Sequence, residues 1–508
     1  MATRLQLALK KKLCQKLLRI LFEIGSETHS ETNIKENKMS DSIKENEPFD
    51  KKTTWNSSTK TIQKIQKLGQ LEYTTICGEI TVDSPTGESD KRDTGKVFYT
   101  AYLTDNIRPL IFFFNGGPGG SSVWLHLGAF GPKFVAGLDV NHSLSQLIDN
   151  PDSLLTCADL VFVDPIGTGF SRHKEGSLPD FCSETADAAS LSQFISRFLG
   201  QHKLWGRPLY LCGESYGGYR VALMSHLLIC KYDLAPKGLI LVAPFLSGTS
   251  GEESEPNLIA EANYLCGYIL SAWYHKKSIL NKSCVDEVSA YKEAKKFAYK
   301  EYLPERLENS PHTIASDIIK KLEAFSGISA TVFKKHGIKT STFCENLFYG
   351  EKKFPGRIDA RYTLEHPFSS TPFYVDASLM ALAHKISPLI NAYLFNEIGW
   401  ESSQSYISFN GELGSLWRFH EPFYSSGFSA LRASLKLNPE MKVYAAGGYF
   451  DLAVPMASVE YDLMQVADTE NLKNRIYIEA FTSGHMMYVK DDCRNQLTTS
   501  IKRYFFNQ

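Results

Sequence analysis

The decisive stretch of this sequence is Pro208-Leu209-Tyr210-Leu211-Cys212-Gly213-Glu214-Ser215-Tyr216-Gly217-Gly218-Tyr219. It opens with a short apolar run, bounded by turn residues and too brief for a helix, which indicates a buried strand. A Gly-x-Ser-x-Gly motif follows, and a helical pattern begins at Tyr219. The motif glycines permit a sharp, strained turn that lifts the Ser215 hydroxyl above the carboxyl end of a sheet. The stretch predicts a nucleophile elbow, but three fixed residues also occur by chance, so the rest of the chain must support it.

Length and charge limit the classes of protein to which the chain can belong. Its 508 residues can bury a large core, and we expect one core with an insertion. The formal net charge of −1 gives no excess of Lys and Arg to neutralise phosphates, so no nucleic-acid partner is predicted. Aromatic residues make up 12% of the chain, which favours a well-packed globular body.

The cysteine pattern argues against metal clusters. Ten cysteines are spread along the chain without a Cys-x-x-Cys pair, and we predict neither a metal site nor a cofactor. A protein of this size does not need disulfides for stability, so the cysteines leave the redox compartment open.

The amino-terminal segment, residues 1–24, has basic residues and leucines at four-residue spacing, the pattern of a basic amphipathic helix. Its lysines and Arg19 interrupt every apolar run, so it makes an unconvincing signal peptide. No stretch reaches the length of a membrane span. The segment is a surface-associating or targeting helix, a partner-binding or inert tail, or a sequence upstream of a true start at Met39. The protein is expected in the cytoplasm or exported by a non-standard route, and its oligomeric state stays open.

The remaining chain predicts a parallel sheet preceded by a leader. Residues 25–69 are polar and are expected to form a flexible leader. Strands over 71–82 and 97–103 should form an antiparallel hairpin. Further strands are expected at 110–114, 160–163, 209–212, 239–242, 442–446 and 475–480, and a helix over 191–198 that Gly200 closes. Strands that alternate with helices indicate a mostly parallel sheet flanked by helices, with ligands at the carboxyl ends of the strands.

A helical insertion is expected to divide the catalytic core. Residues 251–350 are mainly helical in pattern and more polar than their surroundings. We predict that they form a cap, and that residues 70–250 and 351–508 form the core. Whether such a cap moves as a lid or is a plain accessory subdomain stays open.

A loop of small residues, Asn115-Gly116-Gly117-Pro118-Gly119-Gly120-Ser121-Ser122, follows the strand at 110–114. It lacks the Gly-Lys-Ser/Thr ending of a phosphate-binding loop and any Gly-x-Gly-x-x-Gly, so a nucleotide site is not predicted. At this place an α/β-hydrolase keeps one of its two oxyanion-hole amides, although a tight structural turn would have the same composition. A second turn-rich segment, 164–171, is expected to be either structural or a pocket wall.

Two ionisable side chains follow the last predicted strands. Asp451 ends the loop after the strand at 442–446, and His485 ends the loop after the strand at 475–480. A serine hydroxyl needs a base, and an imidazole serves best when a carboxylate holds its tautomer. The order Ser215, Asp451, His485 is the Ser, Asp, His order of α/β-hydrolases.

Together, the loop at 115–122, the elbow at 213–218 and Ser483-Gly484-His485 closely resemble the serine carboxypeptidase family. The segments 123–129, Gly356-Arg357-Ile358-Asp359-Ala360-Arg361 and 451–455 look like its bacterial branch. The resemblance covers roughly residues 70–505. It implies an α/β-hydrolase fold with a helical insertion, and hydrolysis of a peptide's last bond through an acyl-enzyme.

The resemblance also implies catalytic roles. Ser215 would be the nucleophile, His485 the general base and then acid, and Asp451 the carboxylate that orients it. The backbone amides of Gly117 and Tyr216 would form the oxyanion hole.

For substrate binding, the resemblance implies that Asn115, Gly116 and Glu214 hold the free carboxylate of a peptide. A carboxylate at Glu214 would repel that group unless it is protonated, in which state it donates a hydrogen bond. This predicts an exopeptidase favoured at acidic pH, whereas a surface position for Glu214 would remove the argument.

Two departures from the family matter. Its better-known eukaryotic members carry a second glutamate where this chain has Ala129, and a cysteine where it has Gly120, so their disulfides are not carried over. Because of Ala129, an esterase or acyltransferase with the same triad is the main alternative to a carboxypeptidase. A binding protein without catalysis is the third hypothesis.

Overall fold

The computed structural model describes residues 58–85, 94–139, 144–247, 257–351, 353–365, 376–419 and 427–508. The amphipathic segment 1–24 and most of the predicted leader lie outside these residues. All of the described residues lie in one compact unit, Trp55–Gln508.

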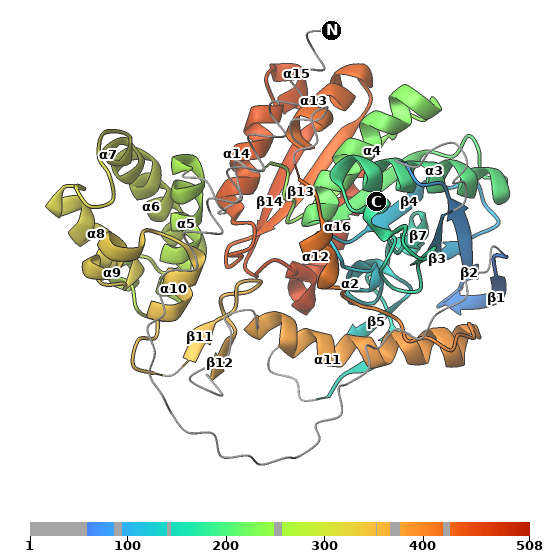
Figure 1. Cartoon of the computed structure of the whole chain (residues 1–508), viewed down its shortest axis with the longest axis horizontal. Helices are drawn as coiled ribbons and strands as arrows, with labels where there is room; N and C mark the ends of the chain where they lie inside the picture. Colours follow the sequence, from blue (N-terminus) through green and yellow to red (C-terminus); the bar gives the residue numbers. More distant parts are fainter. Residues whose placement is uncertain are drawn as a thin grey trace, which may run out of the picture. The chain divides into compact units, whose positions relative to one another are not determined.

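A ten-stranded sheet forms the centre of this unit, with the strand order β1-β2-β3-β7-β4-β9-β10-β13-β14 and β8 paired with β3 (Figure 1). Its strands are β1 Thr61–Leu68, β2 Leu71–Val82, β3 Gly95–Leu103, β4 Leu110–Phe114, β7 Asp159–Val163, β8 Arg172–His173, β9 Leu209–Glu214, β10 Gly238–Val242, β13 Lys442–Gly448 and β14 Ile476–Phe481. Two small hairpins lie outside it, β5 Lys133–Ala136 with β6 Gln146–Asp149 and β11 Lys353–Pro355 with β12 Thr363–Glu365.

The sheet is parallel from β7 to β14 and antiparallel from β1 to β7. This arrangement, with the serine motif directly after β9, confirms the predicted α/β-hydrolase fold. The predicted antiparallel hairpin is formed by β2 and β3. One boundary was wrong, because β1 lies inside the stretch 25–69 predicted as a flexible leader. Its polar residues pair with β2 along the whole strand through the main chain, which its composition does not reveal.

Both faces of the central strands β4, β7, β9 and β10 are buried, which explains why these strands are mainly apolar. In β4, Ile111 and Phe113 point to one core and Leu110, Phe112 and Phe114 to the other. Helices α11 and α16 complete the first core, and helices α3, α4, α13 and α14 complete the second. The carboxyl ends of the central strands are thus held rigidly from both sides.

The helices are α2 Val123–Leu125, α3 Glu184–Gln201, α4 Tyr216–Tyr232, α5 Leu258–Tyr274, α6 Glu287–Phe297, α7 Leu303–Glu308, α8 Ser316–Ser326, α9 Ala330–His336, α10 Thr340–Asn346, α11 Ala377–Ala392, α12 Glu412–Leu416, α13 Gly427–Leu437, α14 Met456–Val466, α15 Glu470–Lys473 and α16 Asp491–Phe506. The helix expected over 191–198 is α3, which begins earlier because the Ser183 side chain caps it. Gly200 does not end it, since the helix continues to Gln201.

Helices α5 to α10 occupy the range predicted as a helical insertion and lie beside α14 (Figure 1). They share a buried apolar cluster with the loop that follows β13, including Phe450 and Leu452. Tyr264 of α5 donates a hydrogen bond to the carbonyl of Ala453 at 2.9 Å. The insertion therefore braces the loop that carries Asp451, and its role as a cap stays a prediction.

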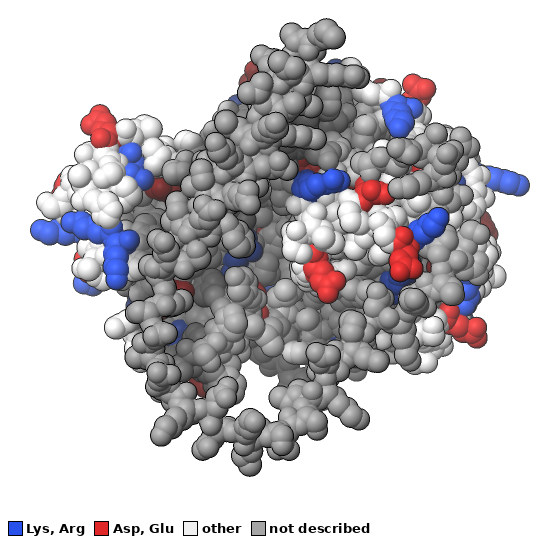
Figure 2. All heavy atoms as spheres, in the orientation of Figure 1, with Lys and Arg blue, Asp and Glu red and all other residues white. Residues whose placement is uncertain are grey.

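The surface agrees with the near-zero net charge. Acidic and basic side chains lie close together over the right-hand part of the described surface in Figure 2. Within the described ranges, no helix combines the length and apolar character that crossing a membrane requires.

Candidate active site

The predicted elbow is a strained turn between β9 and α4. Ser215 has φ 59° and ψ −127°, a conformation that non-glycine residues rarely adopt. It is half-buried, whereas the residues of β9 before it and the first turn of α4 after it are buried. The turn therefore exposes this side chain alone at the carboxyl end of the strand.

The two motif glycines cannot be replaced by other residues, because backbone atoms occupy the space that a Cβ would need. A Cβ on Gly213 would lie 2.1 Å from the carbonyl oxygen of Gly217, and a Cβ on Gly217 would lie 2.4 Å from the carbonyl oxygen of Phe114. These distances are far below van der Waals contact, so the Gly-x-Ser-x-Gly pattern has a steric cause.

The glycine loop after β4 packs directly on the elbow. A Cβ on Gly116 would lie 2.6 Å from the amide nitrogen of Tyr216 and 2.9 Å from the Cβ of Ser215. Tyr216 is the first residue of α4, where amides have no acceptor within the helix. Gly117, the other predicted oxyanion donor, follows Gly116 with φ +111°. The glycine loop thus lies against Ser215 at the amino terminus of α4, the positive end of that helix.

Asp451 and His485 come together as predicted. The Nδ1 atom of His485 lies 2.6 Å from Oδ2 of Asp451. The other carboxylate oxygen accepts the amides of Ala453 and Val454 at 2.7 and 2.9 Å, and Asp451 is fully buried. With Nδ1–H donated to the carboxylate, Nε2 is left as the basic nitrogen.

Charge interactions affect the pKa of His485. Burial lowers this pKa, but the carboxylate of Asp451 and the nearby Glu214 outweigh burial and raise it above 6.5. Tyr488, three residues after His485, lies within hydrogen-bond distance of Glu214, so the loop that carries His485 lies at the elbow. Within the described ranges no hydrogen bond joins the Ser215 hydroxyl to the ring. Such catalytic contacts are often long until substrate binds.

Glu214 is buried, with 3% of its surface exposed, which excludes the surface position considered from the sequence. Asn115 Nδ2 donates to its Oε2 at 2.5 Å, and the Tyr488 hydroxyl lies 3.0 Å from Oε1 and 2.9 Å from Oε2. Burial raises the pKa of Glu214 to about 7, against smaller lowering effects from His485 and from the two hydrogen-bond donors. The side chain can therefore be protonated at mildly acidic pH.

The segment 164–171, left open as structural or binding, has a bracing role. Oδ1 of Asp164 accepts the Ser122 amide at 2.9 Å and the Ser122 hydroxyl at 2.7 Å, at the end of the glycine loop. It also accepts the Tyr406 hydroxyl at 2.8 Å. On the other side, buried Arg220 of α4 donates to the carbonyl of Asn115 and to Asp187 of α3. Both ends of the glycine loop are thus held by buried charged groups.

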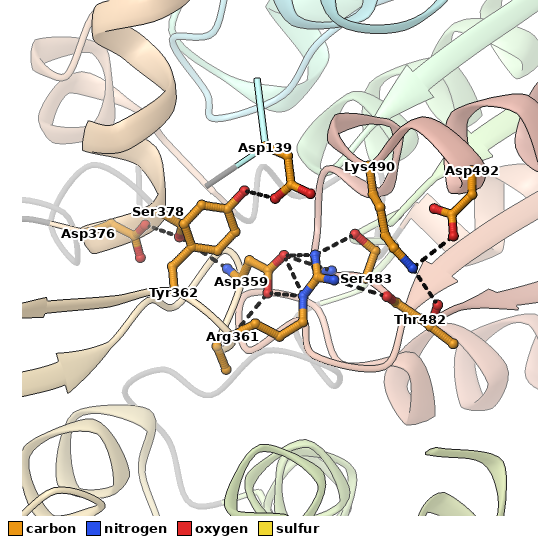
Figure 3. Close-up of polar contacts among 12 residues, drawn as sticks. Asp139, Asp359, Arg361, Tyr362, Asp376, Ser378, Thr482, Ser483, Lys490 and Asp492 are labelled. Carbon is orange, nitrogen blue, oxygen red and sulfur yellow. Dashed lines mark hydrogen bonds and ion pairs between the residues drawn. The ribbon is translucent and has the colours of Figure 1, made fainter. Parts of the chain in front are cut away.

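Segment 356–361, noted in the sequence only for its resemblance, connects the loops of Asp451 and His485. Figure 3 shows its Asp359 and Arg361 beside Thr482 and Ser483 of the second loop. Main-chain bonds join Leu452 to Arg357 at 2.9 Å and His485 to Ile358 at 2.7 Å. Asp359 Oδ2 accepts the Gly484 amide at 3.1 Å.

Arg361 completes this connection. It donates to both carboxylate oxygens of Asp359, to the Thr482 carbonyl at 3.1 Å and to the Ser483 hydroxyl at 3.0 Å. The segment therefore positions both loops, a role that its residues alone did not reveal.

The two departures from the family lie in buried positions. Ala129 is fully buried in the π-helical turn His126–Phe130, and Gly120 is buried in the glycine loop. The nine cysteines that the structure describes are free thiols.

Comparison with known proteins agrees with the resemblance. Residues 87–322 match the model of the serine carboxypeptidase family. Serine carboxypeptidase-like 17 of Arabidopsis thaliana is 26% identical over 218 residues, 42% of this chain and 48% of the relative. Serine carboxypeptidase-like 4 of the same plant is 26% identical over 277 residues, 53% and 55% of the two chains. Serine carboxypeptidase S10 family member 1 of Dictyostelium discoideum is 34% identical over 137 residues, 27% and 31%.

These matches confirm the likeness to serine carboxypeptidases. The chain spans about half or less of the length of these curated relatives. The family match includes the glycine loop and the elbow and ends before Asp451 and His485. None of these three relatives is bacterial, so the likeness to the bacterial branch stays a prediction.

Solved structures with related folds include an esterase from Thermogutta terrifontis, with TM-score 0.33, 13% identity and coverage of 84% of this chain and 97% of the other. A proline iminopeptidase of Mycobacterium smegmatis has TM-score 0.31, 11% identity and coverage of 84% and 99%. The α/β-hydrolase fold of this chain follows from its sheet topology and from the position of the serine motif directly after β9.

Proposed function

We propose that the protein is a serine carboxypeptidase that removes the last residue of peptides through an acyl-enzyme. The observation that carries this proposal is the buried Glu214 beside Ser215, hydrogen-bonded to Asn115 and able to hold a proton near neutral pH. An acid held at this place can donate a hydrogen bond to a carboxylate. The free carboxylate of a peptide is the group that it would recognise.

The chemistry follows from the proposed roles. Ser215 Oγ attacks the carbonyl carbon of the last peptide bond while His485 Nε2 accepts the serine proton. The amides of Gly117 and Tyr216 stabilise the oxyanion, and Asp451 stabilises the imidazolium. His485 then gives the proton to the leaving amine, and the C-terminal residue departs. Water, deprotonated by the same nitrogen, hydrolyses the ester and regenerates the Ser215 hydroxyl.

Recognition of the substrate carboxylate is assigned to Glu214 and Asn115, with Gly116 as the backbone beside them. The protonated carboxyl of Glu214 donates to the substrate, whereas its ionised form repels it. This supports activity on free-acid peptides that declines as pH rises past the pKa of Glu214, about 7.

A pair of matched peptides tests the proposal. A peptide with a free carboxylate and the same peptide blocked as the amide are compared from acidic to alkaline pH, with Ser215→Ala as the inactive control. We expect the free acid to be cleaved at its last bond with higher kcat/KM below about pH 7. Equal or faster cleavage of the amide at every pH contradicts the proposal.

The esterase or acyltransferase alternative is favoured by one observation, the presence of Ala129 where a second acid would strengthen carboxylate recognition. The same triad would then transfer an acyl group from an ester. Product analysis with an added alcohol separates transfer from hydrolysis. A binding function without catalysis would require that a fluorophosphonate probe fails to label Ser215 in the folded protein.

A further inference from the structure

Tyr488 lies directly behind Glu214 in a buried position. It belongs to the 3₁₀ turn Met487–Val489, three residues after His485, and only 1% of its surface is exposed. Its hydroxyl is within 3.0 Å of both carboxylate oxygens of Glu214. The catalytic roles proposed for Ser215, Asp451 and His485 do not use this hydroxyl.

The ring of Tyr488 packs against the chain at Gly128, the residue before Ala129. A Cβ on Gly128, the preceding residue, would lie 2.8 Å from a carbon of the ring. Gly128 and Ala129 belong to the π-helical turn His126–Phe130, so the ring lies against the turn that carries position 129. Within the described ranges, Asn115 and Tyr488 are the hydrogen-bond donors to the Glu214 carboxyl.

We propose that Tyr488 is a positioning and specificity-determining residue for free carboxylates, whose hydroxyl supplies to Glu214 the hydrogen bond that a second acid at position 129 would supply. This inference rests on the proposed carboxypeptidase function. It names Tyr488 as the residue that makes up for the lack of an acid at position 129.

A phenol and a carboxyl partner differ in how they titrate. A second acid next to Glu214 would share a proton with it, and the pair would ionise in two coupled steps. Burial and the neighbouring Glu214 raise the pKa of Tyr488 well above 10, so its hydroxyl donates throughout the working range. Carboxylate recognition in this chain therefore depends on one titration, that of Glu214.

The groups that face Glu214 set the direction of its response. They are His485 after β14, Asp451 after β13, Cys212 of β9 and Tyr488. His485 and the tyrosine hydrogen bond favour the ionised carboxyl, and Asp451 opposes it. Removing the Tyr488 hydroxyl thus raises the pKa of Glu214 and keeps it protonated to higher pH.

The decisive variant is Tyr488→Phe, assayed with matched free-acid and amide peptides across pH. We expect the alkaline limb of kcat/KM for the free acid to move up by about one pH unit. At acidic pH, KM for the free acid should rise about fivefold to tenfold with little change in kcat, because Glu214 has lost one of its two anchors. Cleavage of the amide should change less than about twofold.

The matched control is Tyr302→Phe. Tyr302 is equally buried and donates to Glu261 at 2.9 Å within the helical insertion. Its loss should leave the pH limb and the free-acid preference unchanged. An unchanged limb and KM in Tyr488→Phe, or equal changes in both variants, would overturn the inference.

Two further measurements keep the outcomes separable. Wild-type protein without free-acid preference defeats the proposed function itself, whereas preference retained in full by Tyr488→Phe defeats this inference alone. Should Tyr488→Phe fail to fold, Glu214→Gln is the second variant, since a neutral amide at 214 removes the alkaline limb if Glu214 titration causes it. Persistence of the limb in Glu214→Gln would remove Glu214 from its proposed role in carboxylate recognition and would overturn the inference with it.

Discussion

Arg361 donates hydrogen bonds to both oxygens of the Asp359 carboxylate, from Nε to Oδ1 at 2.9 Å and from Nη2 to Oδ2 at 2.6 Å. The same guanidinium reaches Ser483, two residues before His485, while Asp359 accepts the amide of Gly484. The pair is largely buried. Figure 3 shows the pair joined to Thr482 and Ser483 of the loop that leads to His485. Because Arg357 of the same segment bonds through its main chain to Leu452, the pair is part of the framework that holds the His485 and Asp451 loops together.

Replacing Arg361 by Ala leaves the Asp359 carboxylate buried without its counter-charge. We expect the free energy of unfolding to fall by about 3 kcal/mol. Ser215 labelling by a fluorophosphonate should slow between about tenfold and a hundredfold, because His485 loses its fixed position. Urea denaturation and labelling kinetics measure the two effects.

The control for that variant is Lys436→Ala, which removes an exposed ion pair with Asp468. A surface pair of this kind contributes less than about 1 kcal/mol, and it is remote from the site. Equal losses in the two variants would show that Arg361 acts as an ordinary surface charge.

Asp451→Asn tests the orientation of His485. The asparagine can still face the imidazole, but it is neutral and has one acceptor oxygen in place of two. It therefore cannot accept both the Nδ1–H of His485 and the two backbone amides as the carboxylate does. The wrong tautomer then lacks a basic Nε2, and kcat should fall about 10³- to 10⁴-fold while KM changes little. Single-turnover acylation rates check this, with exposed Asp468→Asn as the neutral comparison. A loss below about tenfold would remove Asp451 from its assigned role.

Gly213→Ala tests the steric origin of the elbow. The new Cβ would stand 2.1 Å from the Gly217 carbonyl oxygen, so the turn must open. We expect loss of Ser215 labelling and destabilisation of at least about 2 kcal/mol. In Gly414→Ala, a Cβ meets nothing within 4 Å in α12, and this helix substitution should be neutral or slightly stabilising. Retained labelling in Gly213→Ala contradicts the argument.

The parallel strands and the elbow were predictable because their causes are local. A strand buried on both faces must be apolar throughout, as Leu110–Phe114 is, and only glycine fits the contacts at 213 and 217. Strand β1 was missed because it is held by main-chain pairing with β2 while all of its side chains stay exposed or half-buried. Helix α11 is similarly hidden by Pro388 in its interior, a residue that usually signals a helix end.

The supporting residues of the site were not predictable because their partners are distant in sequence. Tyr488 and Glu214 are 274 positions apart, and Arg361 and Ser483 are 122 apart. No periodicity or motif spacing records such a contact. The sequence motifs predicted the candidate catalytic residues, whereas the hydrogen bonds that anchor these residues appeared only when the chain was folded.

Glu214→Gln tests the cost of burying an ionised acid. The pKa of Glu214 in the folded protein is about 7, above the ordinary value of 4.5, so the folded state binds its proton more tightly than the unfolded chain. The stabilisation of the folded state by this tighter proton binding is fully present below pH 4.5. It is lost as the pH rises to about 7, which lowers the free energy of unfolding by about 3 kcal/mol. The amide cannot ionise. Relative to the wild type, the variant should therefore gain about 3 kcal/mol in unfolding free energy over this interval. Urea denaturation from about pH 4 to pH 8 measures this gain. The control Glu470→Gln changes an exposed residue, so its unfolding free energy should parallel that of the wild type at every pH. A parallel curve for Glu214→Gln would instead show that ionisation of the buried carboxyl does not destabilise the fold.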